Sequence, residues 1–340
     1  MHKKCIDVRC DGGVSIGMGH VMRCIALANI LGDAFNIRFV IQQSTDNVKQ
    51  AIRAAGFEYI EIPRTEDFQI ESTYIHKYLR PDSIVILDGY NFQSNYQKAI
   101  KEYHHILIAI DDLYAWRQYA DIVINHGGHI NADSYKKEAY TKLLLGYDYL
   151  LLRKEFYSIT RRKSIHTIEQ AILSFGASDE YNLTFRFATW LLEHNPTINL
   201  HILASEINPH FNDLRNLAER SRRVQLHSDI PANRVIEILQ DSQLLICPAS
   251  TISLEGSAVG ISILSGTTAS NQMNNCDTIT KSGAALGLGD LNQCSKEDFL
   301  QAFDYLCNNA DVLNKQLIAQ ATMIDGKSAD RILSEIMLIV

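Results

Sequence analysis

The chain has 340 residues, of which 46% are hydrophobic and 21% charged, and its formal net charge is −7 at pH 7. A chain of this length is too long to fold around one simple core, which predicts two domains. The negative charge argues against nucleic acid as the main partner. Seven scattered cysteines without a CxxC pair, and no signal-peptide pattern, predict a reducing, cytoplasmic compartment. No apolar run reaches the ~18 residues of a membrane-spanning helix, so membrane insertion is not expected.

The first half of the chain alternates apolar runs with amphipathic ones. Near-continuous apolar runs such as "SIVILDG" are typical of parallel strands buried on both faces, and an apolar spacing of three to four residues indicates helices. The predicted strands are 5–10, 37–42, 83–89, 104–112 and 121–125, and the predicted helices are 20–31 and 46–56. This alternation predicts βαβ units and a mostly parallel sheet.

A basic stretch, "RKEFYSITRRKS", interrupts the pattern, and we place a domain boundary there, which gives domains 1–158 and 159–340. The alternation then restarts. The predicted strands are 170–176, 199–204, 244–250 and 262–266, and the predicted helices are 182–194, 208–220, 251–260, 296–308, 312–321 and 328–339. We therefore expect an α/β protein with two sheets facing a cleft. Open parallel sheets bind ligands outside the carboxyl ends of their strands, so the cleft is the expected site.

The loop "GMGH" before the first predicted helix looks like a dinucleotide fingerprint but lacks two of its parts. Met22 replaces the third glycine, and the second strand ends in Gln42-Gln43 instead of an acidic residue, so NAD is not expected. His126 and His129 lie in the turn-like segment "NHGGH" with no third ligand nearby, which predicts a surface loop and no zinc site. The sequence thus gives no sign of a metal or cofactor.

His20 follows Gly17 and Gly19 at the first turn of the predicted helix 20–31. The positive end of a helix dipole favours a neutral imidazole, which can accept a proton, and it also attracts phosphate. A simple turn cap fits the same position. His20 is therefore a candidate for either role.

Polar residues also follow the predicted strands of the first half. Asp88 and Tyr90 end one strand, and Asp111-Asp112 end the next. At the carboxyl ends of parallel strands such residues fall on the cleft side, which makes them site candidates. Helix or turn capping is the alternative role for Asp111, and the sequence favours it slightly over a role in catalysis.

The second half contains two strand-to-helix turns rich in small or hydroxyl residues, "SFGASDEYN" and "CPASTISLEG". In each, a helix N-terminus points at whatever the turn approaches, as at phosphate sites. Glu255 follows the second turn and could accept two ribose hydroxyls or complement the helix dipole. Asn271, in the later polar turn "TTASNQ", could contact a substrate or cap a helix.

Together these segments resemble one family, the UDP-sugar hydrolases of pseudaminic acid biosynthesis. The resemblance runs through "RCDGGVSIGMGHVMRCIALA", "ILDGY", "IDDL", "LLGYDYLLLRKEF", "LSFGASDEYN", "CPASTISLEGSAVG", "SNQ" and "IDGKSADRI". That family removes UDP from UDP-2,4-diacetamido-2,4,6-trideoxy-β-L-altropyranose and is related to spore-coat polysaccharide proteins and the lipid II-forming glycosyltransferase. The resemblance implies a glycosyltransferase-B fold of two Rossmann-like domains, with the nucleotide held by the second domain and no metal.

The resemblance also implies roles for single residues. The catalytic residues would be His20, Tyr90 and Asn271, with Glu255 gripping the uridine ribose. The implied substrate- and UDP-binding residues are Asp11, Gly17, Gly19, Gly176, Ser178, Ser250, Thr251, Glu255 and Gln272. Ala177 stands where the family commonly has a second glycine.

The predicted function is hydrolysis of this UDP-activated diacetamido-trideoxyhexose by water attack at the anomeric carbon. The alternative on the same fold is a nucleotide-sugar glycosyltransferase of surface polysaccharide synthesis, and a non-catalytic sugar-nucleotide-binding protein is a third interpretation. The expected partner is the sugar nucleotide, with association in trans with other enzymes of the pathway also open.

Overall fold

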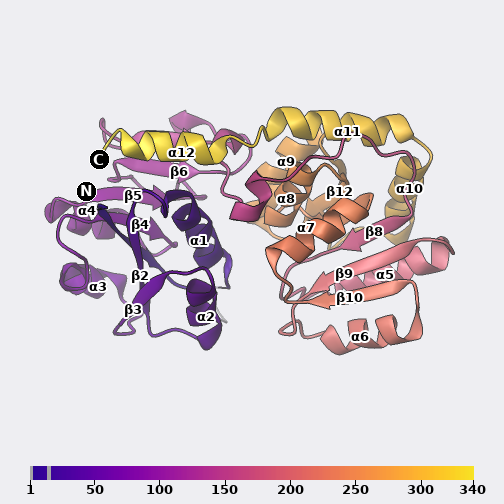
Figure 1. The fold of residues 1–340 in the computed structure, drawn as a ribbon, viewed down its shortest axis with the longest axis horizontal. Helices are drawn as coiled ribbons and strands as arrows, with labels where there is room; N and C mark the ends of the chain where they lie inside the picture. The colour runs from indigo at the N-terminus through magenta and orange to yellow at the C-terminus, as the bar shows by residue number, and fades with distance from the viewer. Residues whose placement is uncertain (1–2, 14–16) are drawn as a thin grey trace. The chain divides into compact units, whose positions relative to one another are not determined.

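The computed structural model describes residues 3–13 and 17–340, and the chain divides into two compact units (Figure 1). The first unit comprises Met1–Lys154 and Lys327–Val340, and the second comprises Glu155–Gly326. The predicted boundary after residue 158 lies close to the observed one. The last segment differs, because the prediction placed it in the second domain and the structure places it in the first.

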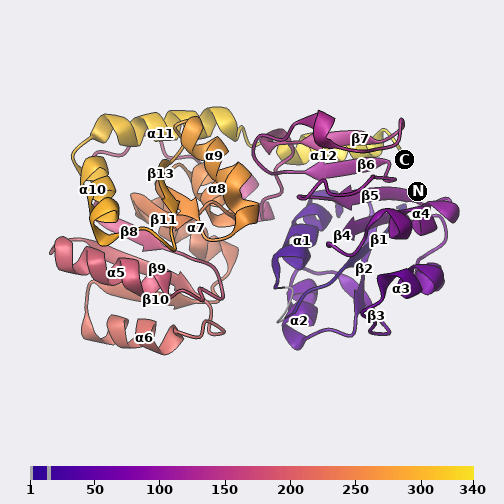
Figure 2. The ribbon, with the colours of Figure 1, turned by 180° about the vertical axis from the view of Figure 1, so that it is seen from behind.

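The first unit is built on one seven-stranded parallel sheet in the order β3-β2-β1-β4-β5-β6-β7. Figure 2 shows β7 at the edge beside β6. The strands are β1 (Cys5–Cys10), β2 (Asn36–Gln42), β3 (Glu58–Ile62), β4 (Ile84–Asp88), β5 (Ile106–Ile110), β6 (Ile122–Asn125) and β7 (Lys142–Leu145). The helices are α1 (Gly19–Leu31), α2 (Asp46–Ala54), α3 (Phe68–Tyr74), α4 (Ser94–Glu102) and α12 (Ser328–Met337).

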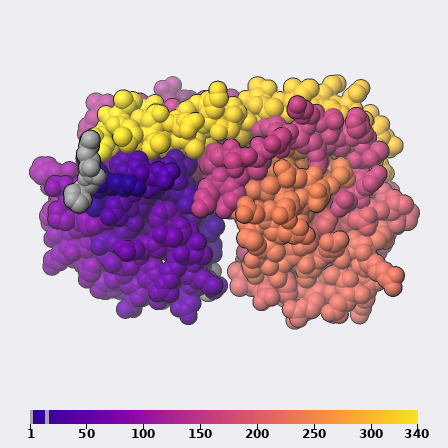
Figure 3. All heavy atoms as spheres, in the orientation of Figure 1, coloured from indigo at the N-terminus to yellow at the C-terminus, as the bar shows by residue number. Residues whose placement is uncertain are grey.

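The C-terminal helix α12 returns to the first unit because its apolar side completes that core. Ile332 and Ile336 are fully buried in the same cluster as residues of β1 and α1. Ser328 Oγ donates to the carbonyl oxygen of Leu150 at 2.8 Å, which ties the start of the helix to the same unit. In Figure 3 the yellow atoms of this last segment lie on the indigo and violet atoms of the first unit.

The second unit carries a six-stranded parallel sheet in the order β10-β9-β8-β11-β12-β13. The strands are β8 (Gln170–Leu173), β9 (Asn199–Ala204), β10 (Val224–Ser228), β11 (Leu244–Pro248), β12 (Ser262–Thr267) and β13 (Leu286–Asp290). The helices are α5 (Leu183–His194), α6 (Phe211–Arg220), α7 (Ala232–Asp241), α8 (Thr251–Val259), α9 (Met273–Lys281), α10 (Lys296–Cys307) and α11 (Ala310–Met323). The predicted α/β class with parallel sheets is confirmed.

Each sheet has a point where the strand order reverses. In the first unit the chain runs outward from β1 to β3 and then places β4 on the other side of β1. In the second unit the same reversal occurs between β8 and β11. Ligands of open α/β sheets bind outside the carboxyl ends of the strands at such points. The loops after β1 and β4, and those after β8 and β11, are therefore the places to look for a site.

Candidate functional site

His20 and Asp88 meet at the reversal point of the first sheet. Asp88 ends β4 and lies in register with Cys10 at the end of β1, while His20 is the second residue of the helix that follows β1. His20 Nδ1 lies 2.7 Å from Asp88 Oδ1. The sequence placed His20 outside the apolar face of its helix, and the structure buries the side chain, 8% exposed, against a carboxylate.

Arg23, one helical turn after His20, joins the two acidic strand ends. Its Nε and Nη2 donate to Asp88 Oδ2 and Oδ1 at 2.7 and 2.6 Å, and its Nη1 donates to Asp112 Oδ2 at 2.8 Å. Burial alone raises the pKa of Asp88, but the charge and hydrogen bonds of Arg23, with the bond from His20, bring that pKa below its usual value. Asp88 is therefore a fixed carboxylate at neutral pH.

This charge arrangement defines the tautomer of His20 when its ring is neutral. Arg23 Nη2 also lies 3.0 Å from His20 Nδ1, but a guanidinium offers only donors, and Asp88 Oδ1 is nearer at 2.7 Å. Nδ1 therefore carries the hydrogen that is donated to Asp88, and the lone pair lies on Nε2. A His oriented in this way by a carboxylate has the form of a general base.

Tyr90, named above as a site candidate because it follows the same strand, lies beside this pair. Its ring meets the His20 ring edge-on, with centroids 4.8 Å apart and planes at 84°. Its hydroxyl lies 3.4 Å from Asp112 Oδ2, to which it can donate, and the side chain is 41% exposed. The structure thus brings His20, Tyr90 and Asp88 together in the first unit.

His126 is a residue that the sequence interpretation set aside as part of a surface loop. It follows β6 directly, and His129, three residues later, is the exposed member of the pair. His126 Nδ1 is buried and has no hydrogen-bond partner among the described residues. Burial, together with the charge of Arg23, lowers the pKa of His126 to about 4. The rule that singled out Asp88, a polar residue at the carboxyl end of a buried parallel strand, also selects His126, which directly follows β6.

Asp11 belongs to a second polar network, at the end of β1. Arg9, fully buried, pairs with Glu71 through Nε at 2.7 Å and with Asp11 through Nη2 at 2.7 Å. Tyr96 Oη and Gln42 Nε2 each donate to Glu71 at 2.7 Å, and the Gln42 backbone N–H donates to Asp11 Oδ1. Burial lowers the pKa of Arg9, but the two carboxylates and Tyr96 bring it well above its usual value. Through its bonds to Arg9 and to the Gln42 backbone, Asp11 links the end of β1 to the end of β2.

Asp111 and the loop glycines have simpler local roles. The Asp111 carboxylate accepts the backbone N–H groups of Leu113 and Tyr114, which is the turn-capping alternative stated for it above. Gly17 has φ +79°, and a Cβ at Gly17 or Gly19 would meet nothing within 4 Å. Residues 14–16 of this loop lie outside the described residues.

In the second unit, two predicted turns lie after the neighbouring strands β8 and β11. Gly176 adopts φ +90°, and Gly176 and Ser178 are exposed. Asp179, just after them, accepts the backbone N–H groups of Leu183 and Thr184 at the start of α5. Asp179 therefore fixes the turn to the start of α5, while Gly176 and Ser178 stay exposed to solvent.

The turn after β11 leads into α8. Ser250 is the N-cap residue and Thr251 is the exposed first residue of the helix. Glu255, the fifth residue of α8, is only 3% exposed. The N-terminus of α8 thus presents backbone N–H groups at the reversal point of the second sheet.

Asn271 and Gln272 lie in the short 3-10 helix Ser270–Gln272 that follows β12. Asn271 is exposed. Gln272 Oε1 accepts the backbone N–H of Thr268 at 2.7 Å and its hydroxyl at 3.2 Å, so the Gln272 oxygen stabilises the turn.

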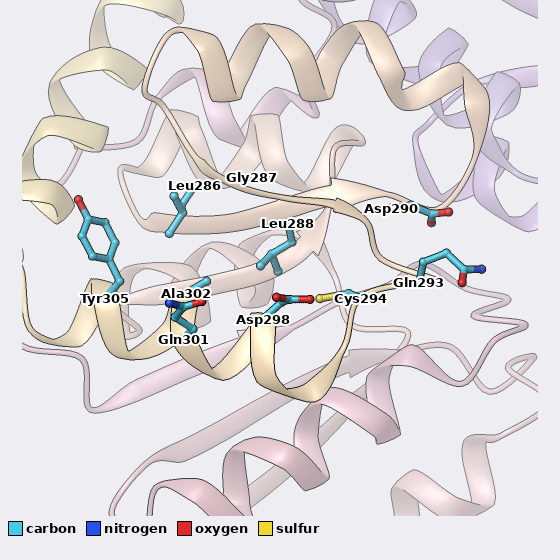
Figure 4. Close-up of a pocket in the computed structure, with 10 residues that line it drawn as sticks. All are labelled: Leu286, Gly287, Leu288, Asp290, Gln293, Cys294, Asp298, Gln301, Ala302 and Tyr305. Atoms are coloured by element: carbon cyan, nitrogen blue, oxygen red, sulfur yellow. The ribbon is translucent and has the colours of Figure 1, made fainter.

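A cavity of about 560 Å³ lies elsewhere in the second unit, between β13 and α10 (Figure 4). None of the predicted site residues lines it. Its ten lining residues include the carboxylates of Asp290 and Asp298 and no Lys or Arg, which is the wrong charge for a diphosphate.

Across residues 3–13 and 17–340, no group of three or more His, Cys, Asp or Glu side chains could hold a metal ion. In that same part of the chain, no helix is long and apolar enough to cross a bilayer.

Comparisons with known proteins bear on the fold. No protein-family model matches the chain. It is 29% identical over 273 residues to the uncharacterized protein MJ1062 of Methanocaldococcus jannaschii, covering 76% of this chain and 54% of that protein. The chain therefore spans about half the length of that curated relative.

Solved structures match over nearly the whole chain. MurG of Acinetobacter baumannii has a TM-score of 0.66 at 13% identity, covering 98% of this chain and 99% of that one. MnaA of S. aureus, solved with UDP, has a TM-score of 0.65 at 12% identity, covering 99% and 96%. A glycosyltransferase from Rickettsia africae has a TM-score of 0.64 at 13% identity, covering 100% and 98%. The chain has the glycosyltransferase-B fold. The predicted pair of Rossmann-like domains is thereby confirmed.

Proposed function

We propose that this protein hydrolyses a UDP-activated sugar, UDP-2,4-diacetamido-2,4,6-trideoxy-β-L-altropyranose, to UDP and the free sugar. The observation that carries the proposal is the 2.7 Å contact between His20 Nδ1 and Asp88 Oδ1 at the reversal point of the first sheet. It leaves Nε2 as the proton acceptor, which is the form a water-activating base needs. The choice of sugar rests on the sequence resemblance.

The proposed reaction is a single displacement. The oxygen of water forms a bond to the anomeric carbon while the bond from that carbon to the diphosphate oxygen breaks, and UDP leaves with the electron pair. His20 Nε2 takes the proton from the attacking water. The transition state resembles an oxocarbenium ion, so both water activation and stabilisation of the leaving group lower its energy.

The second unit would hold UDP. The open turn at Gly176 and the N-terminus of α8 after Ser250 supply backbone N–H groups that can bind a diphosphate. Glu255 would accept the ribose hydroxyls. MnaA of S. aureus, which shares this fold, was solved with UDP, and this supports a nucleotide site in a chain of this architecture.

Proton NMR of the purified protein with this sugar nucleotide tests the proposal directly. Free reducing sugar and UDP, appearing together without any acceptor, are the expected products. A single displacement predicts that the first anomer to appear is inverted at the anomeric carbon, and retention would contradict that step. Turnover that requires an added acceptor would instead establish a glycosyltransferase. Binding without turnover would establish a non-catalytic sugar-nucleotide-binding protein.

Replacing Asp88 with Asn is expected to lower kcat about 100-fold with little change in UDP affinity. The amide cannot hold the His20 tautomer as firmly, and it takes from Arg23 one of its two charged partners, Asp88 and Asp112, among the described residues. The rate of UDP release measures the effect. Asp82→Asn is the matched control, because Asp82 is exposed and its φ of +56° suits Asn. An equal rate loss in both variants would contradict the role given to Asp88.

Replacing Glu255 with Gln is expected to weaken UDP binding about tenfold, the effect of losing one charged hydrogen-bond partner. Calorimetric titration with UDP measures it. Glu297→Gln, at an exposed position of α10 in the same unit, should bind UDP like the unchanged protein. If the Glu255 variant also keeps its full affinity, Glu255 does not contact the nucleotide.

A further inference from the structure

Two side-chain atoms near His20 stay without hydrogen-bond partners in the described part of the chain. They are Asp112 Oδ1 and His126 Nδ1, and both are buried. Buried polar atoms in proteins nearly always have a partner, and an unpartnered one calls for an explanation such as a bound water or ligand. Two such atoms on neighbouring loops make a stronger case than one.

The sheet register explains why these two residues are neighbours. Asp88, Ile110 and Ile124 lie side by side near the ends of β4, β5 and β6. Asp112 lies two residues after Ile110, and His126 lies two residues after Ile124. The backbone N–H of Asp111 donates to the carbonyl oxygen of Ile124 at 3.0 Å, which holds the two loops together.

The charges of the cluster determine what each atom can do. Asp112 Oδ2 accepts from Arg23 Nη1 at 2.8 Å, so this carboxylate is paired with a cation and its Oδ1 can only accept a hydrogen bond. Arg23, Asp88 and Asp112 are the charged groups that act on His126. With its pKa near 4, His126 is neutral at physiological pH and offers one accepting and one donating ring nitrogen.

We propose that Asp112 Oδ1 and His126 Nδ1 form a subsite that binds polar substituents of the sugar, namely hydroxyl groups or the N–H of an acetamido group. Such groups can donate to Asp112, and a hydroxyl can donate to or accept from His126. This subsite rests on the proposed function, because it lies around His20 and takes the sugar half of the same substrate. It adds His126, which the sequence placed in a surface loop, to the residues that select the sugar.

His126→Phe tests the subsite, because it keeps the ring shape but removes both ring nitrogens, and His129→Asn is the control from the same loop. His129 lies in the same loop, is exposed, and has φ +34°, which Asn tolerates. For His126→Phe we expect a KM for the sugar nucleotide that is about tenfold higher. The affinity for the free sugar, measured by ligand-observed NMR with UDP present, should be about tenfold weaker. The Kd for UDP should stay within about twofold. The His129 variant should match the unchanged protein in all three.

A His126 variant with unchanged KM and sugar affinity overturns the proposal, and so does one in which UDP affinity falls by the same factor. If His126→Phe melts far below the unchanged protein, His126→Gln, whose amide reaches the place of Nε2 and not that of Nδ1, replaces it in the same measurements.

The proposed function can fail separately. A protein that does not hydrolyse the nucleotide but binds the free sugar more weakly without His126 disproves the hydrolase and supports the subsite. If the unchanged protein neither hydrolyses the nucleotide nor binds the sugar, both proposals are wrong.

Discussion

Replacing His20 with Asn is expected to reduce turnover at least about 1,000-fold while the Kd for UDP stays within about twofold. The Asn side-chain amide can occupy the place of Nδ1 and still donate to Asp88 Oδ1, so the buried carboxylate keeps a partner. The substitution removes Nε2, the atom to which we assign the proton of the attacking water. The rate of UDP release and calorimetric titration with UDP measure the two quantities.

The same experiment separates catalysis from folding and binding. His129→Asn, an exposed histidine in the same unit, should keep the full rate. A His20 variant that hydrolyses at the normal rate but no longer binds UDP would contradict the assignment. A loss of both, with an unchanged melting temperature, would place His20 in nucleotide binding.

The two parallel sheets could be predicted from the sequence because their central strands, such as β4 and β11, are buried on both faces. The run of β4, all five residues of which are buried, is short and is followed by Gly89, which favours a buried strand over a helix. The edge strand β3 was missed, since four of its five residues are partly or fully exposed and leave only a weak apolar pattern. The helix at 328–339 was predicted, but its place in the first unit depends on where Ile332 and Ile336 find apolar partners.

The same distinction applies to the candidate site. Asp88 and Tyr90 could be found from the sequence because strand ends in parallel sheets place polar residues at one edge. Arg23 could not, because on a helix it looks like an ordinary exposed cation, and its contact with Asp112 joins residues 89 positions apart. The strand-end rule also selects His126, but the presence of His129 three residues later in the sequence suggested a metal site or a surface loop instead.

The Arg9–Glu71 pair leads to the largest expected change in stability. Both side chains are fully buried, and the Arg9 guanidinium also faces the ring of Phe92, 5.0 Å from its centroid. Arg9→Met or Glu71→Leu should each lower the unfolding free energy of the first unit by about 3–5 kcal/mol, because each leaves a buried charge without its main partner. Each unit contains one tryptophan, Trp116 and Trp190, so urea unfolding of these variants in a Trp190→Phe background reports the first unit alone.

The double variant Arg9→Met/Glu71→Leu decides whether charge or shape dominates this network. Removing both charges leaves no orphaned ion, so the double variant should lose clearly less stability than the two single variants together. A residual loss should remain, because Tyr96 Oη and Gln42 Nε2 no longer have Glu71 as acceptor. Strictly additive losses would show that Arg9 and Glu71 contribute independently, and a single-variant loss below about 1 kcal/mol would contradict the buried pair itself.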